Sequence, residues 1–530
     1  MSNQTTFSGM ISSCFLGMIL TLLDVLSYGR NIYGNTGNPE LENMGIAIFI
    51  YTTIIAQISY NIFTSIESGV VAGFICENTT LLSSLFLYCS SFSDDIEVIH
   101  TNFYICRILS VLLFSMISIS LKAFKVESII MNIPEPAISG CLAYIGISQI
   151  KMGYSEVDYD NYKSIYLIII ALTLALAMYV LTEIAINSNY TLPMSCLVFV
   201  VFFYIIAYLK YKKDTLDILR ELEWIGKLDK TKVYPTQLFK HFNISKISKN
   251  IIFKCLPKSI SISLFSIIHI AINLPAFFAK TKTSYIFSNE LKNQSISNLL
   301  TSFMGGHNYF IASYSILFNK SGGTKTSGII LGFCLLIIPI FGPVLKGFIP
   351  KALLSALPML MGLYFIVPTV LSYHECFIFE YCIIYITVLL SEFTEIPIIG
   401  LAGGYLSCLI LHFIHKMSNK PSIIIDVDAP VIRITHSLTF WNINKLVEDM
   451  ARNKNNEIII LDLYQCIYID WNARIKLSEI FSHPTPYVIL IVKDKILINS
   501  SDVNSEKLYK VNNHDKAIEL YYNLVSKLKI

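Results

Sequence analysis

The chain has 530 residues, of which 54% are hydrophobic and only 15% carry a charge. Soluble domains carry about 25% charged residues, so this composition excludes an ordinary soluble protein and indicates an integral membrane protein. The apolar segments are long and well separated, which favours membrane-spanning helices in a lipid bilayer over a β-barrel. The net charge of +3 indicates no particular partner, and we expect no binding of nucleic acid.

The first part of the chain contains a series of apolar segments that are long enough to cross a bilayer. We expect spans at residues 11–29, 44–63, 101–121, 126–150, 163–185 and 191–209. We expect no cleavable signal, because the polar start and the apolar run after it carry no cleavage pattern. Asp24 lies inside the first span, where a carboxylate costs roughly 2.5–3.5 kcal/mol on insertion scales. It should therefore face a cavity or a partner group, or else lie at the membrane interface.

Polar and small residues interrupt the apolar pattern after the second span, between residues 64 and 77. We predict an irregular approach here, followed by a half-helix that ends near residue 92. A helix N-terminus offers free N–H groups and a positive dipole end, which favour anions unless nearby carboxylates reverse the sign. Glu67 and Glu77 are therefore candidate substrate-binding residues. The alternatives are that Glu67 packs within the break and that Glu77 faces a loop.

Residues 210–258 form the one long polar insert, with 12 basic and 5 acidic residues, a difference of +7. We interpret it as a linker between two halves, with a short interfacial helix near Trp224 as the alternative. The second half resumes with apolar segments at residues 259–280, 327–346, 349–370, 375–390 and 396–415. We estimate about twelve strong apolar segments in all, and two weakened segments at the breaks would bring the total to about fourteen spans.

A second break lies in Asn298–Ser315, which reads NLLTSFMGGHNYFIASYS. Overlaid on NIFTSIESG, it places Asn61 on Asn298, Thr64 on Thr301, Ser65 on Ser302 and Gly69 on Gly306. A second overlay places Ile133-Pro134, Ser139 and Gly146 on Ile349-Pro350, Ser355 and Gly362. Interrupted helices at corresponding positions of two halves are the best sequence pointer to a transporter's binding site. His307, Asn308 and Tyr309 are therefore candidate substrate-binding residues, with packing roles as the alternative.

The composition changes at Pro421, after which the sequence predicts a soluble α/β domain. We expect strands at Ile423–Asp426, Val431–Thr435, Glu457–Leu463 and Tyr487–Val492, and helices at Trp471–Phe481 and His514–Lys527. The predicted fold class is an all-α polytopic membrane protein with a C-terminal soluble α/β domain. The predicted parts are a first membrane repeat at 1–209, a linker at 210–258, a second repeat at 259–418 and the soluble domain at 419–530.

No enzyme site is evident, because we find no nucleophile–base pair, phosphate-binding loop or metal-ligand cluster. We therefore expect neither a cofactor nor a metal. The twelve cysteines are scattered through apolar segments without Cys-x-x-Cys spacing. We interpret them as reduced structural residues, because buried thiols behave as small hydrophobic groups.

The membrane part resembles the SulP (sulfate permease) family of anion transporters, on Ser288-Asn289-Glu290-Leu291 leading to Gly305-Gly306. The tail resembles the STAS domain of that family, on Asp462 and Asp470 in LDLYQCIYID. Trp471-Asn472 stands where bacterial STAS domains have a phosphorylatable residue, which does not support a phosphorylation switch there. The resemblance implies two seven-helix inverted repeats with core and gate parts, and half-helix N-termini facing each other near Gly73 and His307. It also implies a homodimer and a cytoplasmic STAS domain that can bind a partner protein.

Two departures from the family pattern bear on the substrate. Typical members carry a glutamate where this chain has Asn273, in HIAINLPA, and lack a charge near the position of Asp24. Both HIAINLPA and LLDVLSYG resemble a fungal branch found in organelle membranes, in which transport of basic amino acids into the vacuole has been proposed for a member.

These observations leave three functions open. The first is a secondary transporter that moves sulfate or another inorganic anion by alternating access. The second is a proton-coupled transporter of basic amino acids in an organelle membrane, favoured by the carboxylates and by the lack of Arg or Lys at either break. Asp24 is then the candidate for proton coupling, because a buried carboxylate can take up and release a proton. The third is a membrane sensor that transports nothing and signals through its STAS domain. The sequence does not distinguish a plasma membrane from a vacuole-like membrane.

Overall fold

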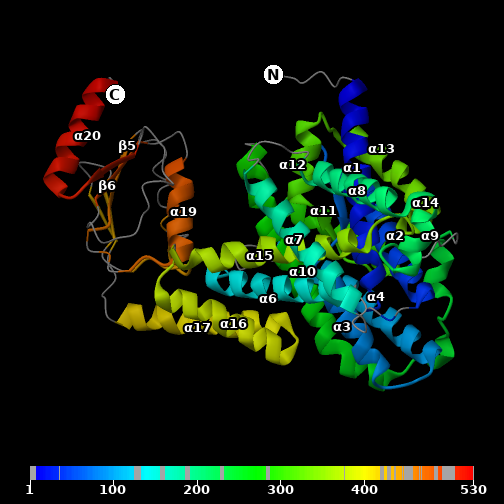
Figure 1. Ribbon diagram of the computed structural model, residues 1–530. Coiled ribbons are helices and arrows are strands. Elements are labelled where there is room, and N and C mark those ends of the chain that lie inside the picture. Colours follow the sequence, from blue (N-terminus) through cyan, green and yellow to red (C-terminus); the bar gives the residue numbers. More distant parts are fainter. Residues whose placement is uncertain are drawn as a thin grey trace. The chain divides into compact units, whose positions relative to one another are not determined.

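The computed structural model is mostly helical, with a small sheet near the C-terminus (Figure 1). It describes residues 7–34, 36, 38–123, 133–155, 162–184, 191–226, 232–281, 287–374, 376–417, 423–426, 431–434, 437–443, 446, 458–464, 466, 468–482, 487–491 and 508–528. The chain forms two compact units, one of residues 1–131 and 143–367 and one of residues 132–142 and 368–530.

The first unit contains the helices that surround both predicted breaks. Its elements are α1 (Phe7–Tyr28), α2 (Pro39–Phe63), β1 (Ala72–Phe74), α3 (Asn78–Ser90), α4 (Ile96–Ala123), most of α6 (Glu135–Ser155), α7 (Tyr162–Ile184), α8 (Thr191–Tyr211), α9 (Thr215–Glu221), α10 (Lys249–Thr281), α11 (Phe287–Thr301), β2 (Asn308–Phe310), α12 (Ala312–Lys320), α13 (Lys325–Cys334), α14 (Ile338–Lys346) and most of α15 (Lys351–Leu371). The second unit contains α16 (Ile378–Thr394), α17 (Pro397–Met417), β3 (Ile423–Asp426), β4 (Val431–Ile434), β5 (Ile458–Asp462), α19 (Trp471–Ser482), β6 (Tyr487–Ile491), β7 (Leu508–Val511) and α20 (His514–Leu528).

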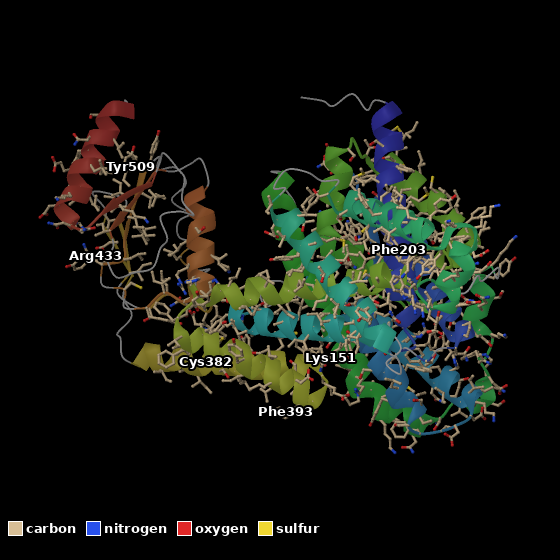
Figure 2. All side chains as sticks on the ribbon, viewed as in Figure 1. Lys151, Phe203, Cys382, Phe393, Arg433 and Tyr509 are labelled. Carbon is tan, nitrogen blue, oxygen red and sulfur yellow. The ribbon has the colours of Figure 1, made fainter. Side chains whose placement is uncertain are left out.

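Nine helices within the described ranges are long and apolar enough to cross a membrane. They are Gly9–Asn31, Pro39–Phe63, Ile96–Ala123, Ile165–Ile184, Met194–Glu221, Lys249–His269, Lys325–Gly342, Lys351–His374 and Pro397–Ile414. Their outer faces carry large apolar side chains such as Leu209 on α8, which is 73% exposed. The shorter helix α16 likewise carries Phe393, which is 84% exposed (Figure 2). Such faces suit contact with lipid, so the predicted helical membrane part is confirmed. The number of about fourteen spans stays a prediction.

Several helix boundaries differ from the predicted ones. Helix α10 begins at Lys249, inside the predicted linker, and α11 begins at Phe287, between the span predicted at 259–280 and the second break. The span predicted at 327–346 is divided by a 3-10 turn at Leu335–Ile337, just before α14 begins at Ile338 with Pro339 in its first turn. Helix α3 begins at Asn78, directly after the irregular stretch predicted at 64–77, whereas α12 begins at Ala312, later than the position near His307 that the family resemblance implies.

The two predicted halves meet at a close helix crossing. Helix α6 begins directly after Pro134 and α15 directly after Pro350, as the overlay of these prolines predicts. A Cβ atom placed on Gly146 would lie 2.8 Å from the Gly362 carbonyl oxygen, and one on Gly362 would lie 2.6 Å from the Gly146 oxygen. The overlaid glycines therefore contact each other reciprocally, as expected for helices related by an internal two-fold axis. Small residues permit this approach of two backbones.

The Gly362→Ala variant should disrupt this crossing, because the added methyl group overlaps a backbone oxygen that cannot rotate away. We expect a loss of stability of about 1–3 kcal/mol and a smaller fraction of monodisperse protein in detergent, measured by size-exclusion chromatography. Gly342→Ala is the matched control, since its nearest neighbour would lie at 3.4 Å, an ordinary contact. Equal behaviour of the two variants would show that the crossing tolerates a side chain.

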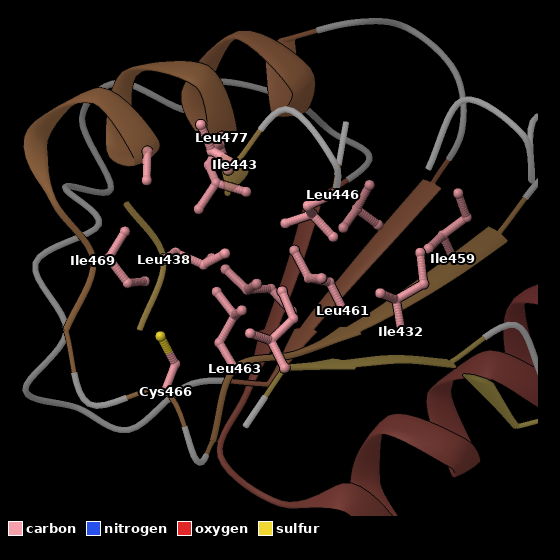
Figure 3. Close-up of a cluster of buried hydrophobic side chains, with 14 residues drawn as sticks. Ile432, Leu438, Ile443, Leu446, Ile459, Leu461, Leu463, Cys466, Ile469 and Leu477 are labelled. Carbon is pink, nitrogen blue, oxygen red and sulfur yellow. The ribbon is translucent and has the colours of Figure 1, made fainter. Parts of the chain in front are cut away.

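The second unit contains a five-stranded sheet in the order β3-β4-β5-β6-β7, parallel except for the β3–β4 pair. Alternate residues of β5 face opposite sides. Ile459 and Leu461 pack with Leu477 of α19 (Figure 3), while Ile458 and Ile460 pack on the side of Ala517 of α20. Helices on both faces explain why β5 is continuously apolar. The predicted strands and helices are therefore present, and β7 is an additional strand that the sequence reading did not predict.

Glu380 joins α16 to α19 within the second unit. Its carboxylate accepts hydrogen bonds from the backbone N–H groups of Phe377 and Trp471 at 2.8 and 2.7 Å, and from the Arg474 guanidinium at 3.0 Å. Glu380 is only 2% exposed, so its charge depends on these donors. The neighbouring Asp470 accepts from the Ala473 N–H at 2.8 Å and fixes the start of α19. Burial raises the pKa of Asp470 to about 7.

Asn472, which stands near the phosphorylatable position of bacterial STAS domains, bonds the backbone at the start of α6. The Asn472 side-chain oxygen accepts a hydrogen bond from the Glu135 N–H at 2.6 Å, and its amide donates to the Ile133 carbonyl at 3.2 Å. Both partners lie at the start of α6. The Asn472 amide offers one donor group and one acceptor, which suits one backbone carbonyl and one backbone N–H. A phosphorylated hydroxyl would offer only acceptors and could not bond the carbonyl.

Candidate functional site

The two breaks form a short antiparallel ribbon in the first unit. Strand β1 pairs with β2, with Gly73 opposite Tyr309. Helix α3 starts four residues after β1 ends at Phe74, and α12 starts two residues after β2 ends at Phe310. The regions near Gly73 and His307 are therefore extended segments rather than the helix N-termini that we predicted, although each leads into a half-helix.

Side-chain amides of α2 and α11 hold the two breaks in equivalent ways. The Asn61 side chain bonds both backbone groups of Val70, and the Asn298 side chain bonds both backbone groups of Asn308. In each helix the residue four positions earlier adds a further bond to the same carbonyl, namely Gln57 in α2 and Gln294 in α11. This shared geometry supports the overlay of Asn61 on Asn298.

The glycine overlay needs a correction of one residue. Gly69 has φ +67°, and the left-handed glycine of the second break is Gly305, with φ +70°, rather than Gly306. Val70, whose backbone Asn61 bonds, lies nine residues after Asn61. Asn308, whose backbone Asn298 bonds, lies ten residues after Asn298, so the second break is one residue longer. A side chain at Gly306 is excluded for a different, steric reason, because a Cβ there would lie 2.3 Å from the Thr52 hydroxyl oxygen.

Glu290 of α11 closes the end of α2 over the first break. The carboxylate is fully buried and accepts bonds from the Thr64 hydroxyl at 2.9 Å and from the Ser65 N–H at 2.9 Å. It also accepts from the Ser65 hydroxyl and the Asn293 amide. This glutamate belongs to the motif that carries the family resemblance, and its place is a structural one beside the site.

Two predicted carboxylates come together in the buried space beside the ribbon. Asp24 of α1 is 9% exposed and accepts a hydrogen bond from the Tyr314 hydroxyl at 3.1 Å. Glu77 immediately precedes α3, is 4% exposed and makes no side-chain cap bond with that helix. The two carboxylates are near enough to interact through their charges. Within the described residues, one Glu77 oxygen has no hydrogen-bond partner and no lysine or arginine forms an ion pair with either group.

Aromatic and polar side chains complete this carboxylate cluster. Tyr309 of β2 lies close enough to interact with both carboxylates, and its ring centre lies 5.2 Å from that of His269 on α10. Tyr28 also lies near Asp24, and Tyr314 donates the hydrogen bond to Asp24 described above. Neither Tyr28 nor Tyr314 was among the candidates predicted from the sequence. Tyr28 could have been found, because it follows Asp24 by four residues and shares its helix face.

The other candidates lie elsewhere. Glu67 is exposed in the turn before Gly69. The buried His307 ring packs edge-on against Phe114 at 5.9 Å. The Asn308 amide is bonded to the Thr301 and Ser297 hydroxyls of α11. The side chain of Asn273 lies outside those that the structure describes. A substrate contact at Glu67, His307 or Asn308 stays a prediction.

A buried arginine also lies against the second break. The Arg107 guanidinium of α4 is fully buried, donates to the Met304 carbonyl at 3.4 Å and lies over the Phe103 ring at 4.9 Å. A Cβ on Gly305 would touch its side chain at 3.0 Å. The sequence reading found no basic residue at either break because Arg107 is brought there by tertiary packing. Its position inside an apolar span was the signal that could have identified it.

Paired interrupted helices beside a buried, charged site define a membrane transporter with internal repeats. The particular family follows from the sequence. The family model described as "Sulfate permease family" matches residues 7–387, and the chain belongs to this family.

One curated relative and two solved structures are similar to this chain. The vacuolar basic amino acid transporter VSB1 of Saccharomyces cerevisiae is 26% identical over 438 residues, which are 77% of this chain and 41% of that protein. The chain thus spans less than half the length of this relative. The transmembrane domain of the cyanobacterial bicarbonate transporter BicA matches with TM-score 0.52 and 14% identity, over 75% of this chain and 96% of that one. The murine anion transporter Slc26a9 matches with TM-score 0.56 and 13% identity, over 99% of this chain and 92% of that one. At these identities the two structures show the fold alone.

Proposed function

We propose that this protein is a secondary transporter that carries a small cationic solute, such as a basic amino acid, through alternating access at the carboxylate cluster. The observation that carries this proposal is the pairing of Asp24 with Glu77 in a buried site without an ion-paired lysine or arginine among the described residues. Two like charges in a space of low dielectric constant are costly alone, and a bound cation offsets that cost.

The size of the competing effects favours a cation. A cation about 4 Å from one carboxylate gains about 4 kcal/mol at an effective dielectric constant of about 20. Each half-helix N-terminus is equivalent to only about half a positive charge, so two such ends offset about one of two carboxylates. The helix dipoles alone therefore do not reverse the negative charge of the two ionised carboxylates.

Asp24 is the proposed site of proton coupling. Exchange of a proton on Asp24 for a bound cation keeps the charge of the site nearly constant, so neither state leaves two unpaired carboxylates in the membrane. The hydrogen bond from Tyr314, at the start of α12, couples this carboxylate to one of the two half-helices.

A second candidate is transport of an inorganic anion such as sulfate, which was the first expectation from the sequence. Membership of the sulfate permease family favours it, and so do the two half-helices that begin beside the ribbon. Protonation of both carboxylates would then leave the helix dipoles to bind the anion. The sign of the substrate charge separates the two candidates.

Ligand binding to the purified full-length chain tests directly whether the substrate is a cation or an anion. We expect arginine to raise the unfolding temperature in detergent in proportion to the logarithm of its concentration above the dissociation constant, since only the folded state binds it. Sulfate at equal ionic strength should have no comparable effect, and citrulline, the uncharged analogue of arginine, is the matched control. Stabilisation by sulfate but not by arginine would reject the cationic substrate.

We further propose that the C-terminal sheet is a STAS domain on the cytoplasmic side and that the membrane part has fourteen spans in two inverted repeats. The order of elements in the sheet and the full-length match to Slc26a9 support this. A homodimer, a partner protein of the STAS domain and the membrane of residence are proposals of the same kind.

A further inference from the structure

We propose that Cys89, Cys106 and Cys255 form a binding site for a thiophilic metal ion, with Zn²⁺ as the favoured ion. The three residues come from α3, α4 and α10, and all three side chains are fully buried. Their sulfur atoms all lie within 4.8 Å of one another, and the Cys89 and Cys255 sulfurs are 3.4 Å apart. This thiol cluster is the one group of three metal-ligating side chains with this geometry in the described part of the chain.

The geometry fits thiolate coordination. Zinc–sulfur bonds of about 2.3 Å place the sulfurs of one ion roughly 3.8 Å apart in tetrahedral geometry and roughly 4.0 Å apart in trigonal geometry. Sulfurs that already converge within 4.8 Å can reach these distances through small rotations of the side chains. Thiolates are soft ligands that select Zn²⁺ and Cu⁺ over hard cations such as Mg²⁺.

The Ser259 hydroxyl is a candidate for the fourth coordination position of the metal ion. Ser259 follows Cys255 by one helical turn on α10, and its buried hydroxyl lies beside the Cys106 thiol. Apart from that thiol, it has no hydrogen-bond partner among the described residues. Its oxygen, or a water bound to it, could complete a tetrahedral set with three sulfurs.

The local charge favours a divalent ion. Three thiolates around Zn²⁺ leave a net charge of −1, whereas three around Cu⁺ leave −2. Lys258 lies near enough to interact with the Cys255 sulfur through its charge, while its ammonium group donates to the Ser84 hydroxyl at 2.7 Å. One ammonium group neutralises the zinc complex and only half of the copper complex.

The thiol cluster ties together helices that serve the transport site. Helix α3 begins just after Glu77 and ends near Cys89, and α10 carries both Cys255 and His269. A metal ion bound to the cluster would fix the ends of these helices relative to α4, away from the moving substrate. Such a site adds folding free energy directly, because the unfolded chain does not hold the ligands together.

Metal analysis of the full-length chain, purified from zinc-supplemented cells, tests the proposal. We expect a stoichiometric amount of zinc in the wild type and its loss in the variant Cys89→Ser/Cys106→Ser/Cys255→Ser. The control variant Cys141→Ser/Cys196→Ser/Cys408→Ser replaces three buried cysteines outside the cluster and should retain the metal. Copper in place of zinc, lost in the same variant, would support the thiolate site and reverse the choice of ion. Wild-type protein that is free of both metals, or equal metal in all three proteins, would overturn the proposal.

A measurement on the wild type alone covers the case in which the cluster variant fails to fold. X-ray absorption at the metal edge should show three sulfur ligands at about 2.3 Å. A shell of nitrogen and oxygen ligands without sulfur would place the metal elsewhere and overturn the proposal. Because the cluster lies apart from Asp24, loss of metal binding and loss of substrate binding can be observed independently.

Discussion

Arginine uptake by proteoliposomes should fall at least about thirtyfold when Asp24 is replaced by asparagine. The substitution keeps the shape and the hydrogen bond with Tyr314 but removes the charge. Loss of a buried pairing between a carboxylate and a cation costs about 2–5 kcal/mol, and each 1.4 kcal/mol corresponds to about tenfold in affinity. Initial rates at an arginine concentration below saturation, with equal amounts of reconstituted protein, measure this effect.

Asp217→Asn is the matched control, because the Asp217 side chain lies outside the bundle on α9 and is 83% exposed. Its uptake should equal that of the wild type. An Asp24→Asn variant that keeps arginine uptake, or loses only its dependence on a pH gradient, would mean that Asp24 does not bind the substrate. Loss of the pH dependence alone would leave Asp24 with proton coupling and transfer substrate binding to Glu77.

The Glu290→Ala variant should lose about 3 kcal/mol or more of stability. Its buried carboxylate accepts bonds from Thr64, Ser65 and Asn293, and each hydrogen bond to a charged group contributes about 1.5–3 kcal/mol. Removal leaves these donors unsatisfied at the end of α2 and loosens the first break. The temperature of half-loss of the monodisperse peak after heating in detergent should fall clearly below that of the wild type.

The half-loss temperature of Glu290→Gln should lie between those of the wild type and Glu290→Ala. The amide oxygen still accepts hydrogen bonds, while the amide nitrogen faces the remaining donors without an acceptor to offer. Glu221→Ala, at an exposed position at the end of α9, is the control and should leave the half-loss temperature unchanged. If Glu290→Ala were as stable as this control, the first break would be held by Gln57 and Asn61 alone.

The repeat and the soluble sheet could be predicted because local patterns encode them. Asn61 and Asn298 hold equivalent backbone groups, and Pro134 and Pro350 each precede a helix, as the overlays predict. Helix α11 was missed because polar residues such as Glu290 break the apolar pattern, although tertiary hydrogen bonds satisfy them. Hydropathy cannot show which polar groups will find partners in the fold.

The candidate site could be predicted only in part. The sequence identified Asp24, Glu77 and Tyr309 singly, from charge or from position at a break, but their proximity depends on tertiary packing, including that of α1 against α12. The same limit explains Arg107, which reaches the second break from α4. The overlay also could not place the left-handed glycine, because the two breaks differ in spacing: Gly69 follows Asn61 by eight residues and Gly305 follows Asn298 by seven.

Uptake of labelled arginine and labelled sulfate into proteoliposomes, each with and without a pH gradient, distinguishes a cationic substrate from an anionic one. We expect arginine to accumulate only when protons can leave in exchange, and sulfate uptake to stay at the level of protein-free liposomes. Sulfate accumulation without arginine accumulation would rule out the cationic substrate, since the half-helix dipoles rather than Asp24 and Glu77 would then set the charge preference of the site.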